Sequence, residues 1–365
     1  MKKPRPVCLL LLVASASLLP AAEPAAPAKP SKPAVWIYTD MSDKRIPGPN
    51  HMGTLNDPDD ISAMAAYLLF ADQFDTRGIV VASTHRANHA TTPDQAAWAD
   101  GLIGSAFRAE SAHLKRVLGG DFPADVRFMQ SGIKATGESF DPSRSYTSLE
   151  AHPTVRALFD EARREPAGSL INVLCWGPLT EPAILVNHAI VTGNTGILAK
   201  LRFIAHWTDS PLHQGTPDHP ENVANCREDA SACAYLKRMA HERRIDYHEC
   251  GAIGQHGIVS GSPKGAAYYD AFKVSRLGRI FAEGKFVHNS VDHSDSATFW
   301  VLLGNWGVSL KDIPPDGTNN AARELANEKI FKDWSRRIHD ELLRRARAAA
   351  GVATDGAATV PNKKV

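Results

Sequence analysis

Short apolar runs alternate along the chain with segments of helical periodicity, and this alternation constrains the fold more than any other feature. Helical spacing of apolar residues runs from Gln95 to Val117 and from Thr180 to His188. Strands that read as continuous apolar runs are buried on both faces. The sequence therefore predicts an α/β fold with a mostly parallel central sheet and helices on both faces. The strand-like runs are residues 34–40, 76–83, 169–175 and 201–205.

Two further segments in the second half of the chain have helical spacing. Residues 229–243 place Ala232, Leu236 and Met239 on one face, and residues 319–349 form a long amphipathic pattern. The other face of the long segment carries charges of both signs, which indicates a solvated surface. Hydrophobic residues make up 43% of the chain and charged residues 22%, which excludes a disordered, collagen-like or coiled-coil protein.

The start of the chain is typical of a secretory signal peptide. Three basic residues precede a short apolar stretch from Val7 to Leu19, and small residues at positions 21 and 22 suit cleavage. We therefore expect a periplasmic or secreted protein with no stable membrane anchor after signal cleavage. The expected organisation is a signal peptide at 1–22, an Ala/Pro-rich linker at 23–34, a single domain at 35–350 and a flexible tail at 351–365.

The charge balance argues against a nucleic-acid partner. The chain carries 41 Lys and Arg against 40 Asp and Glu, and the leader alone holds three of the basic residues. Such a balance gives no global attraction to nucleic acid or to anionic membranes. The sequence leaves open a homo-oligomer.

Four cysteines follow the predicted leader: Cys175, Cys226, Cys233 and Cys250. An oxidising compartment permits disulfides. On one continuous helix, Cys226 and Cys233 would be separated by roughly 10 Å, whereas a disulfide needs Cα atoms within about 7 Å. They can pair only if Cys226 lies before the helix begins, so a disulfide and unpaired cysteines are equally open.

The segment Asp57-Pro58-Asp59-Asp60 is the most informative local feature. It can be a helix start, with Asp57 as the N-cap and Pro58 as the first helical residue. It can also bring Asp59 and Asp60 beside Asp40, which ends the first strand. Two like charges at ~4 Å repel by about 4 kcal/mol at an effective dielectric near 20, so the pKa values rise or a cation binds. Oxygen ligands suit Ca²⁺, which can orient a water for hydrolysis.

Four segments in order resemble the nucleoside hydrolase superfamily (inosine/uridine-preferring type), and in particular its divergent exported nucleoside hydrolase-like branch. The first is Thr39-Asp40 with Asp57-Pro58-Asp59-Asp60, followed by a helix and Gly78-Ile-Val-Val-Ala-Ser-Thr84. The others are Val173-Leu-Cys-Trp-Gly-Pro-Leu-Thr180, Asn225-Cys-Arg-Glu-Asp229-Ala-Ser-Ala232 and Ser294-Asp295-Ser296. The resemblance covers about residues 35–305 and implies the fold of that family.

The resemblance also implies a role for each matching residue. Asp40 would be both a metal ligand and the base that takes a proton from water. Asp60, Asp295 and the backbone carbonyl of Trp176 would complete a Ca²⁺ site. The residues implied to contact a sugar are Asp59, Asn225 and Thr84, although Thr84 differs from the asparagine that the family has near this position.

Three departures from the family pattern concern the base and the leaving group. Eighteen residues separate Asp40 from Asp59, so residues 41–56 must loop out, and Asp57 is a second candidate for the base. Val223 stands in place of a glutamate. Ser294 stands in place of a histidine, and His293, one position away, is a candidate to reach the leaving group.

The resemblance implies a metal-dependent hydrolase of N-glycosidic or related glycosidic bonds that acts on a small ribosyl or other sugar substrate. The alternative is a carbohydrate-binding protein on the same fold with little or no activity. The retained aspartates favour the enzyme, and the missing glutamate and histidine favour the binding protein.

Overall fold

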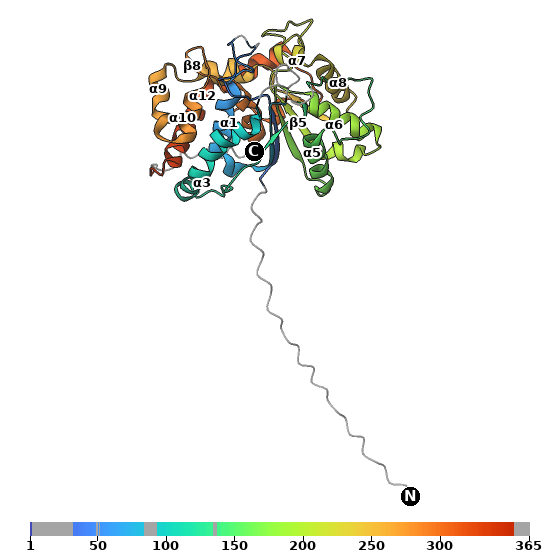
Figure 1. The fold of residues 1–365 in the computed structure, drawn as a ribbon, viewed down its shortest axis with the longest axis horizontal. Coiled ribbons are helices and arrows are strands. Elements are labelled where there is room, and N and C mark those ends of the chain that lie inside the picture. The colour runs from blue at the N-terminus through green and yellow to red at the C-terminus, as the bar shows by residue number, and fades with distance from the viewer. Residues whose placement is uncertain (2–31, 49, 51, 84–92, 134–136, 354–365) are drawn as a thin grey trace. The chain divides into compact units, whose positions relative to one another are not determined.

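Six parallel strands form the central sheet of the protein (Figure 1). Their order is β3-β2-β1-β4-β5-β6, and every neighbouring pair is parallel. The predicted α/β fold with a parallel sheet is confirmed. The strands are β1 (Ala34–Thr39), β2 (Asp75–Val81), β3 (Phe128–Gln130), β4 (Ile171–Trp176), β5 (Leu201–Ala205) and β6 (Asp246–Glu249).

This computed structural model describes residue 1 and residues 32–48, 50, 52–83, 93–133 and 137–353. Most of the predicted leader, linker and tail lies outside these residues, and so does Thr84. Among the described residues, no helix is both long enough and apolar enough to cross a membrane.

Helices cover both faces of the sheet (Figure 1). Successive residues of a strand point to opposite faces, so the continuous apolar run of β1 serves two cores. Val35 and Ile37 pack in one core cluster, whereas Trp36 and Tyr38 pack in the other. One side carries α1 (Asp59–Leu69), α3 (Ser105–Leu118), α10 (Arg276–Ala282) and α12 (Ala321–Ala349), and the other α5 (Pro153–Arg164), α6 (Thr180–Val191) and α8 (Ala230–His241).

The remaining elements are short connections and turns. They are η1 (Ala71–Gln73), α2 (Gln95–Ala99), η3 (Asp100–Gly104), η4 (Thr195–Lys200), α7 (Ala224–Glu228), η5 (Ile253–Val259), α9 (Ala266–Asp270), η6 (Ala271–Val274), β7 (Phe286–Val287), β8 (Ser290–Val291), η7 (Ser294–Ser296), α11 (Ala297–Leu303) and η8 (Leu310–Asp312). β7 and β8 form an antiparallel pair separate from the main sheet.

The long helix α12 buries more polar groups than its sequence pattern indicated. The Arg345 guanidinium pairs with Asp72 and lies 3.9 Å from the centre of the Phe70 ring. Glu324 accepts hydrogen bonds from the Ser210 hydroxyl and from the backbone of Ala252. The expectation of a solvated polar face holds for residues such as Lys329 and Arg336, which are 76% and 68% exposed, but segments distant in the sequence pack against part of that face.

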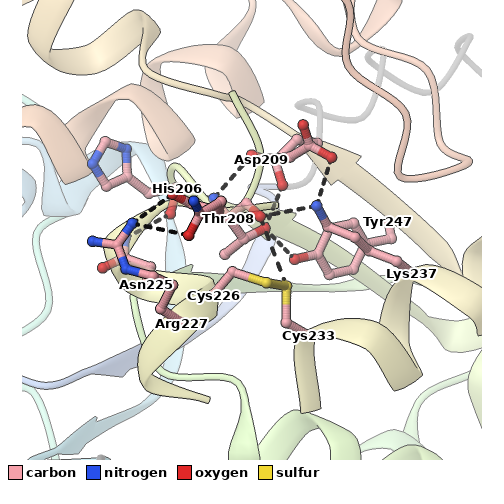
Figure 2. Close-up of a disulfide and its surroundings, with 11 residues drawn as sticks. His206, Thr208, Asp209, Asn225, Cys226, Arg227, Cys233, Lys237 and Tyr247 are labelled. Carbon is pink, nitrogen blue, oxygen red and sulfur yellow. Dashed lines mark hydrogen bonds and ion pairs between the residues drawn. A yellow bond between two sulfur atoms is a disulfide. The ribbon is translucent and has the colours of Figure 1, made fainter. Parts of the chain in front are cut away.

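A disulfide joins α7 to α8 through Cys226 and Cys233 (Figure 2). Their Cα atoms are 5.5 Å apart because α7 ends before Asp229 and α8 begins after it, so no continuous helix separates them. The sequence left this pairing open, and the break between the helices decides it. Cys175 and Cys250 are buried thiols.

The direction in which the chain adds strands to the sheet reverses between β1 and β4, at the centre of the sheet. From β1 the chain proceeds toward one edge through β2 and β3, and from β4 it proceeds toward the other. Thr39 and Trp176, the last residues of β1 and β4, lie side by side in register. Ligands of open parallel sheets bind at such a reversal, beyond the carboxyl ends of the strands. The next residues, Asp40 and Gly177, therefore lie where a ligand is expected.

Candidate active site

A cavity of about 510 Å³ lies at this carboxyl edge of the sheet. Asp40 follows β1, Trp176 ends β4 and His206 follows β5, so three adjacent strands deliver side chains or backbone to it. The aspartates that line it are Asp40, Asp57, Asp59, Asp60 and Asp295. The other lining residues are Asn50, Trp176, His206, Trp207, Gln214, Ala224, Asn225, Glu228, Gln255, Lys285 and Val287.

Three of the aspartates converge on one point. Asp59 and Asp60 form the first turn of α1, and Asp295 lies in the turn before α11. Each offers a carboxylate oxygen, and these oxygens lie within 4.8 Å of one another. The Thr39 hydroxyl at the end of β1 donates to Asp60. We call Asp59, Asp60 and Asp295 the carboxylate trio.

Burial and mutual repulsion disfavour the charged forms of the carboxylate trio. Burial raises the pKa of Asp60 well above its ordinary value, and the charges of Asp295, Asp40 and Asp59 raise it further. Burial also raises the pKa of Asp59, with added repulsion from Asp57 and Asp295. Burial raises the pKa of Asp295 to about 7, although its hydrogen bond with Asp60 acts to lower it. A cation among these oxygens would offset the repulsion.

Asp40 lies close to the trio although 18 residues separate it from Asp59 in the sequence. The intervening segment folds back on itself, because the backbone NH of Leu55 donates to the carbonyl of Ile46 at 2.9 Å. At its base, the Asn56 side-chain amide donates to the Asp40 carbonyl. The excursion thus returns the chain to the cavity, as the spacing of the two acidic segments predicted.

Asn225 faces the same backbone turn as Asp40. A Cβ at Gly177 would lie 3.5 Å from the Asn225 Oδ1 and 3.9 Å from the Asp40 Cγ, and the φ of +95° at Gly177 favours glycine. The Asn225 amide donates to the backbone carbonyl of His206 at 3.1 Å. Figure 2 shows that Asn225 comes from the short helix α7, which the disulfide ties to α8.

His206 places a neutral imidazole beside the trio. Its Nε2 lies 3.8 Å from an Asp295 oxygen, and its Nδ1 is buried with no hydrogen-bond partner among the described residues. Burial lowers the pKa of His206 to about 4, which outweighs the opposing effect of Asp292 and Asp57. The ring is therefore uncharged at neutral pH.

Of the two remaining candidate residues, one is not brought to the cavity and the second lies outside the described residues. His293 is fully buried, where its ring contacts Phe281 and His339, and it is absent from the described residues that line the cavity. Its neighbour Ser294 instead contacts Asp59, at 3.4 Å between the oxygens. The second is Thr84, which lies outside the described residues. Trp176 lines the cavity, but its indole NH donates to Thr298, so its carbonyl is the polar group it can offer there.

Lys285 is a site residue that the sequence pattern missed. Its ammonium lies 2.7 Å from an Asp57 oxygen, 3.3 Å from Asp292 and 3.9 Å from Asp59. The helix-cap interpretation of Asp57 was wrong. Pro58 holds the N-cap position of α1 and no side chain caps the helix, whereas Asp57 pairs with Lys285. No motif surrounds Lys285 in the sequence, so only the fold identifies it.

Comparison with known proteins supports the fold. No family model matches this chain, and no curated protein matches it. A nucleoside hydrolase-related hypothetical protein from Saccharophagus degradans, associated with carbohydrate metabolism, is similar in structure, with a TM-score of 0.59 and 14% identity over 87% of this chain and 72% of that one. The effector protein XOO4466 has a TM-score of 0.42 and 14% identity, over 70% of this chain and 65% of that one.

The plant nucleoside hydrolase PpNRh1 has a TM-score of 0.39 and 14% identity, over 82% of this chain and 79% of that one. The two lower TM-scores carry no argument about this chain. At 14% identity, the first likeness shows a shared fold. This protein therefore has a nucleoside hydrolase-like α/β fold with an acidic cavity at the carboxyl edge of its sheet.

Proposed function

We propose that this protein is a metal-dependent hydrolase of N-glycosidic or related glycosidic bonds, with a small ribosyl or other sugar substrate. One observation carries the proposal: the carboxylate trio converges, together with Asp40 and Asn225, in one cavity at the reversal point of the sheet. The likeness in fold to a nucleoside hydrolase-related protein adds support.

The residues present suit a hard divalent cation. Asp40, Asp60, Asp295 and the Trp176 carbonyl would hold Ca²⁺, because carboxylate and carbonyl oxygens are the ligands it prefers. Asp59 lies within the same reach. When bound, the ion would supply Lewis acidity and lower the pKa of a water.

The protein's own residues then divide the remaining work. Asp40 accepts the proton of the attacking water, while Asp59 and Asn225 hold sugar hydroxyls as positive charge develops on the sugar ring. Asp40 is favoured over Asp57 as the base, because an oxygen of Asp57 is held by the Lys285 ammonium at 2.7 Å.

The leaving-group side of the site is poorer in acids. Val223 and Ser294 stand where the resembled family has a glutamate and a histidine, and His293 packs in the interior. Protonation of a leaving group by a positioned acid is typically worth about 10²–10⁴ in rate. We therefore propose that ordinary nucleosides are poor substrates and that sugars with good leaving groups are better ones. The same observation favours the second candidate function, a carbohydrate-binding protein.

Export to the periplasm or outside the cell is part of the proposal. The basic and apolar leader of the sequence supports it, and a disulfide between Cys226 and Cys233 suits an oxidising compartment.

A comparison of two substrates tests the proposed function. Purified, Ca²⁺-loaded protein is assayed for kcat/KM with inosine and with a nitrophenyl riboside, beside the variant Asp160→Asn, which changes a surface aspartate of α5. Faster turnover of the nitrophenyl riboside by both proteins is expected. Efficient inosine hydrolysis would show that an acid acts on the leaving group after all. Measurable sugar binding without turnover of either compound would favour the binding protein.

A further inference from the structure

Lys285 occupies an unusual place for a lysine. Its side chain is only 7% exposed, and it is the one Lys or Arg among the described residues that line the acidic cavity. A lysine is rarely buried unless it is paired. Here three carboxylates from two segments surround the ammonium: Asp57 and Asp59 at the start of α1, and Asp292 after β8.

The partners of Lys285 are themselves fixed. Asp292 is fully buried, and its two oxygens accept from the Ser294 backbone NH and the Gln255 amide, both at 3.2 Å. The backbone NH of Asp292 donates to the Lys285 carbonyl at 2.7 Å. This hydrogen bond fixes the backbone of Lys285, and the buried carboxylate of Asp292 pairs with its ammonium. The ammonium therefore does not swing freely into solvent.

Its charge is permanent at neutral pH. Three carboxylates whose oxygens lie 2.7–3.9 Å from the ammonium favour its charged form. Such a group is a poor proton donor. It acts on the site through its fixed positive charge.

The charge acts at the edge of the carboxylate trio. Asp59 has oxygens within 4.8 Å of those of Asp60 and Asp295, and one of its oxygens lies 3.9 Å from the Lys285 ammonium. A divalent cation bound by Asp60 and Asp295 would therefore lie next to Asp59, whose carboxylate also contacts a second positive charge. Like charges at this range repel, and burial weakens the screening by solvent.

We propose that Lys285 is a positioning residue that tempers the cation affinity of the carboxylate trio: it holds Asp59 beside Asp57 and Asp292 and repels the ion. This inference rests on the proposed function, because it presupposes a divalent cation in the cavity. It goes beyond that proposal by assigning to a lysine outside the acidic motifs the control of ion affinity.

The test is the Ca²⁺ dissociation constant, measured by calorimetry on the full protein at low ionic strength. Lys285→Met should bind Ca²⁺ more tightly, on the order of tenfold. Lys285→Arg keeps the charge and should bind as the wild type does. Added salt should leave most of the difference between Lys285→Met and wild type in place, because buried charges are screened much less than exposed ones.

A matched control is Lys237→Met. Lys237 is also partly buried and paired, with Asp209 at 2.6 Å. It lies beside the disulfide (Figure 2) and does not line the cavity. Its replacement should leave the Ca²⁺ affinity unchanged. An equal gain of affinity in Lys237→Met would overturn the inference, because the effect would then follow from net charge alone.

If Lys285→Met does not fold, a second pair of variants still tests the role of Lys285. Asp57→Asn removes the closest partner and leaves Asp292 to pair with Lys285. Asp57→Asn should bind Ca²⁺ more weakly than wild type, and Asp57→Asn/Lys285→Met should recover the affinity. Equal affinities with and without Lys285 would reject the role of Lys285 and leave the metal site standing. No Ca²⁺ binding by the wild type would instead reject the metal of the proposed function.

Discussion

Two helices that follow central strands begin with acidic residues, and their surroundings are opposite. Glu181 opens α6 after β4, and its carboxylate accepts from the hydroxyls of Ser83, Ser131 and Thr154 at 2.6–3.1 Å. Asp59 and Asp60 open α1, and their carboxylates face each other and Asp295. All of these groups lie near the carboxyl edge of one sheet.

The difference separates a structural carboxylate from a binding one. Burial raises the pKa of Glu181, and hydrogen bonds from its three hydroxyl donors offset part of that rise. The charged form of Glu181 is therefore stabilised by groups within the protein. In the carboxylate trio, burial is reinforced by the charges of neighbouring aspartates. A buried acid that is short of donors and close to other acids needs a cation or a proton. The predictions below test that contrast.

The largest effect is expected at Asp40, the base in our proposal. Asp40→Asn keeps the size of the side chain and removes its ability to accept a proton, so kcat/KM for a nitrophenyl riboside should fall by about 10²–10⁴. The melting temperature should change little. Activity that survives in Asp40→Asn and disappears in Asp57→Asn would transfer the base role to Asp57.

The second prediction concerns the cation. A ligand at a hundredfold excess over its dissociation constant stabilises the folded state by about 2.7 kcal/mol. Ca²⁺ should therefore raise the melting temperature of the wild type, and a chelator should reverse the rise. The shift should be lost in Asp60→Asn and Asp295→Asn. A full shift in both variants would mean that the ion binds elsewhere.

Glu181 should respond in the opposite way. Glu181→Gln leaves some of its hydroxyl partners without an ionised acceptor, and a buried group that loses its hydrogen bond costs about 1–3 kcal/mol. Urea unfolding should show a loss of that size, while the Ca²⁺-induced rise in melting temperature persists. If Glu181→Gln abolished the rise, the contrast between the two sites would fail.

The last prediction concerns a pH dependence in the metal-free protein. The pKa of Asp295 is about 7 in the folded state, above the value of about 3.9 expected when unfolded. Its stabilising contribution is therefore complete below about pH 4 and is lost as the pH rises toward 7. In chelator, the wild type should lose stability relative to Asp295→Asn over this range. With excess Ca²⁺ the loss should disappear, because the ion binds the deprotonated form. A constant difference at every pH in chelator would contradict the perturbed pKa.

Local pattern was sufficient for most of the sheet. The runs at β1, β2, β4 and β5 are rich in residues that pack on both faces, so the sequence predicted them as buried strands. β3 and β6 were missed because they have three and four residues, too few to show a period. Neighbouring strands supply the pairing that defines such short segments.

The acidic segments were also readable from the chain, because Asp40 follows a strand and Asp59 and Asp60 start a helix, and both positions fall at the carboxyl edge of a parallel sheet. The sequence also offered His293 as a candidate, but the fold buries it against Phe281 and His339. The backbone conformation of the turn before α11 determines which side chain faces the cavity, and the packing around that turn fixes this conformation.

The sequence by itself determined the α/β architecture and the acidic character of the site, because both follow from short-range periodicity and from residues at strand and helix ends. Only the tertiary structure decided which groups pair with the acidic side chains and balance their charge. Lys285 meets Asp57 across 228 residues of chain, and Cys226 pairs with Cys233 because a helix ends between them. Such contacts depend on where distant segments pack, and no local pattern of residues encodes that position.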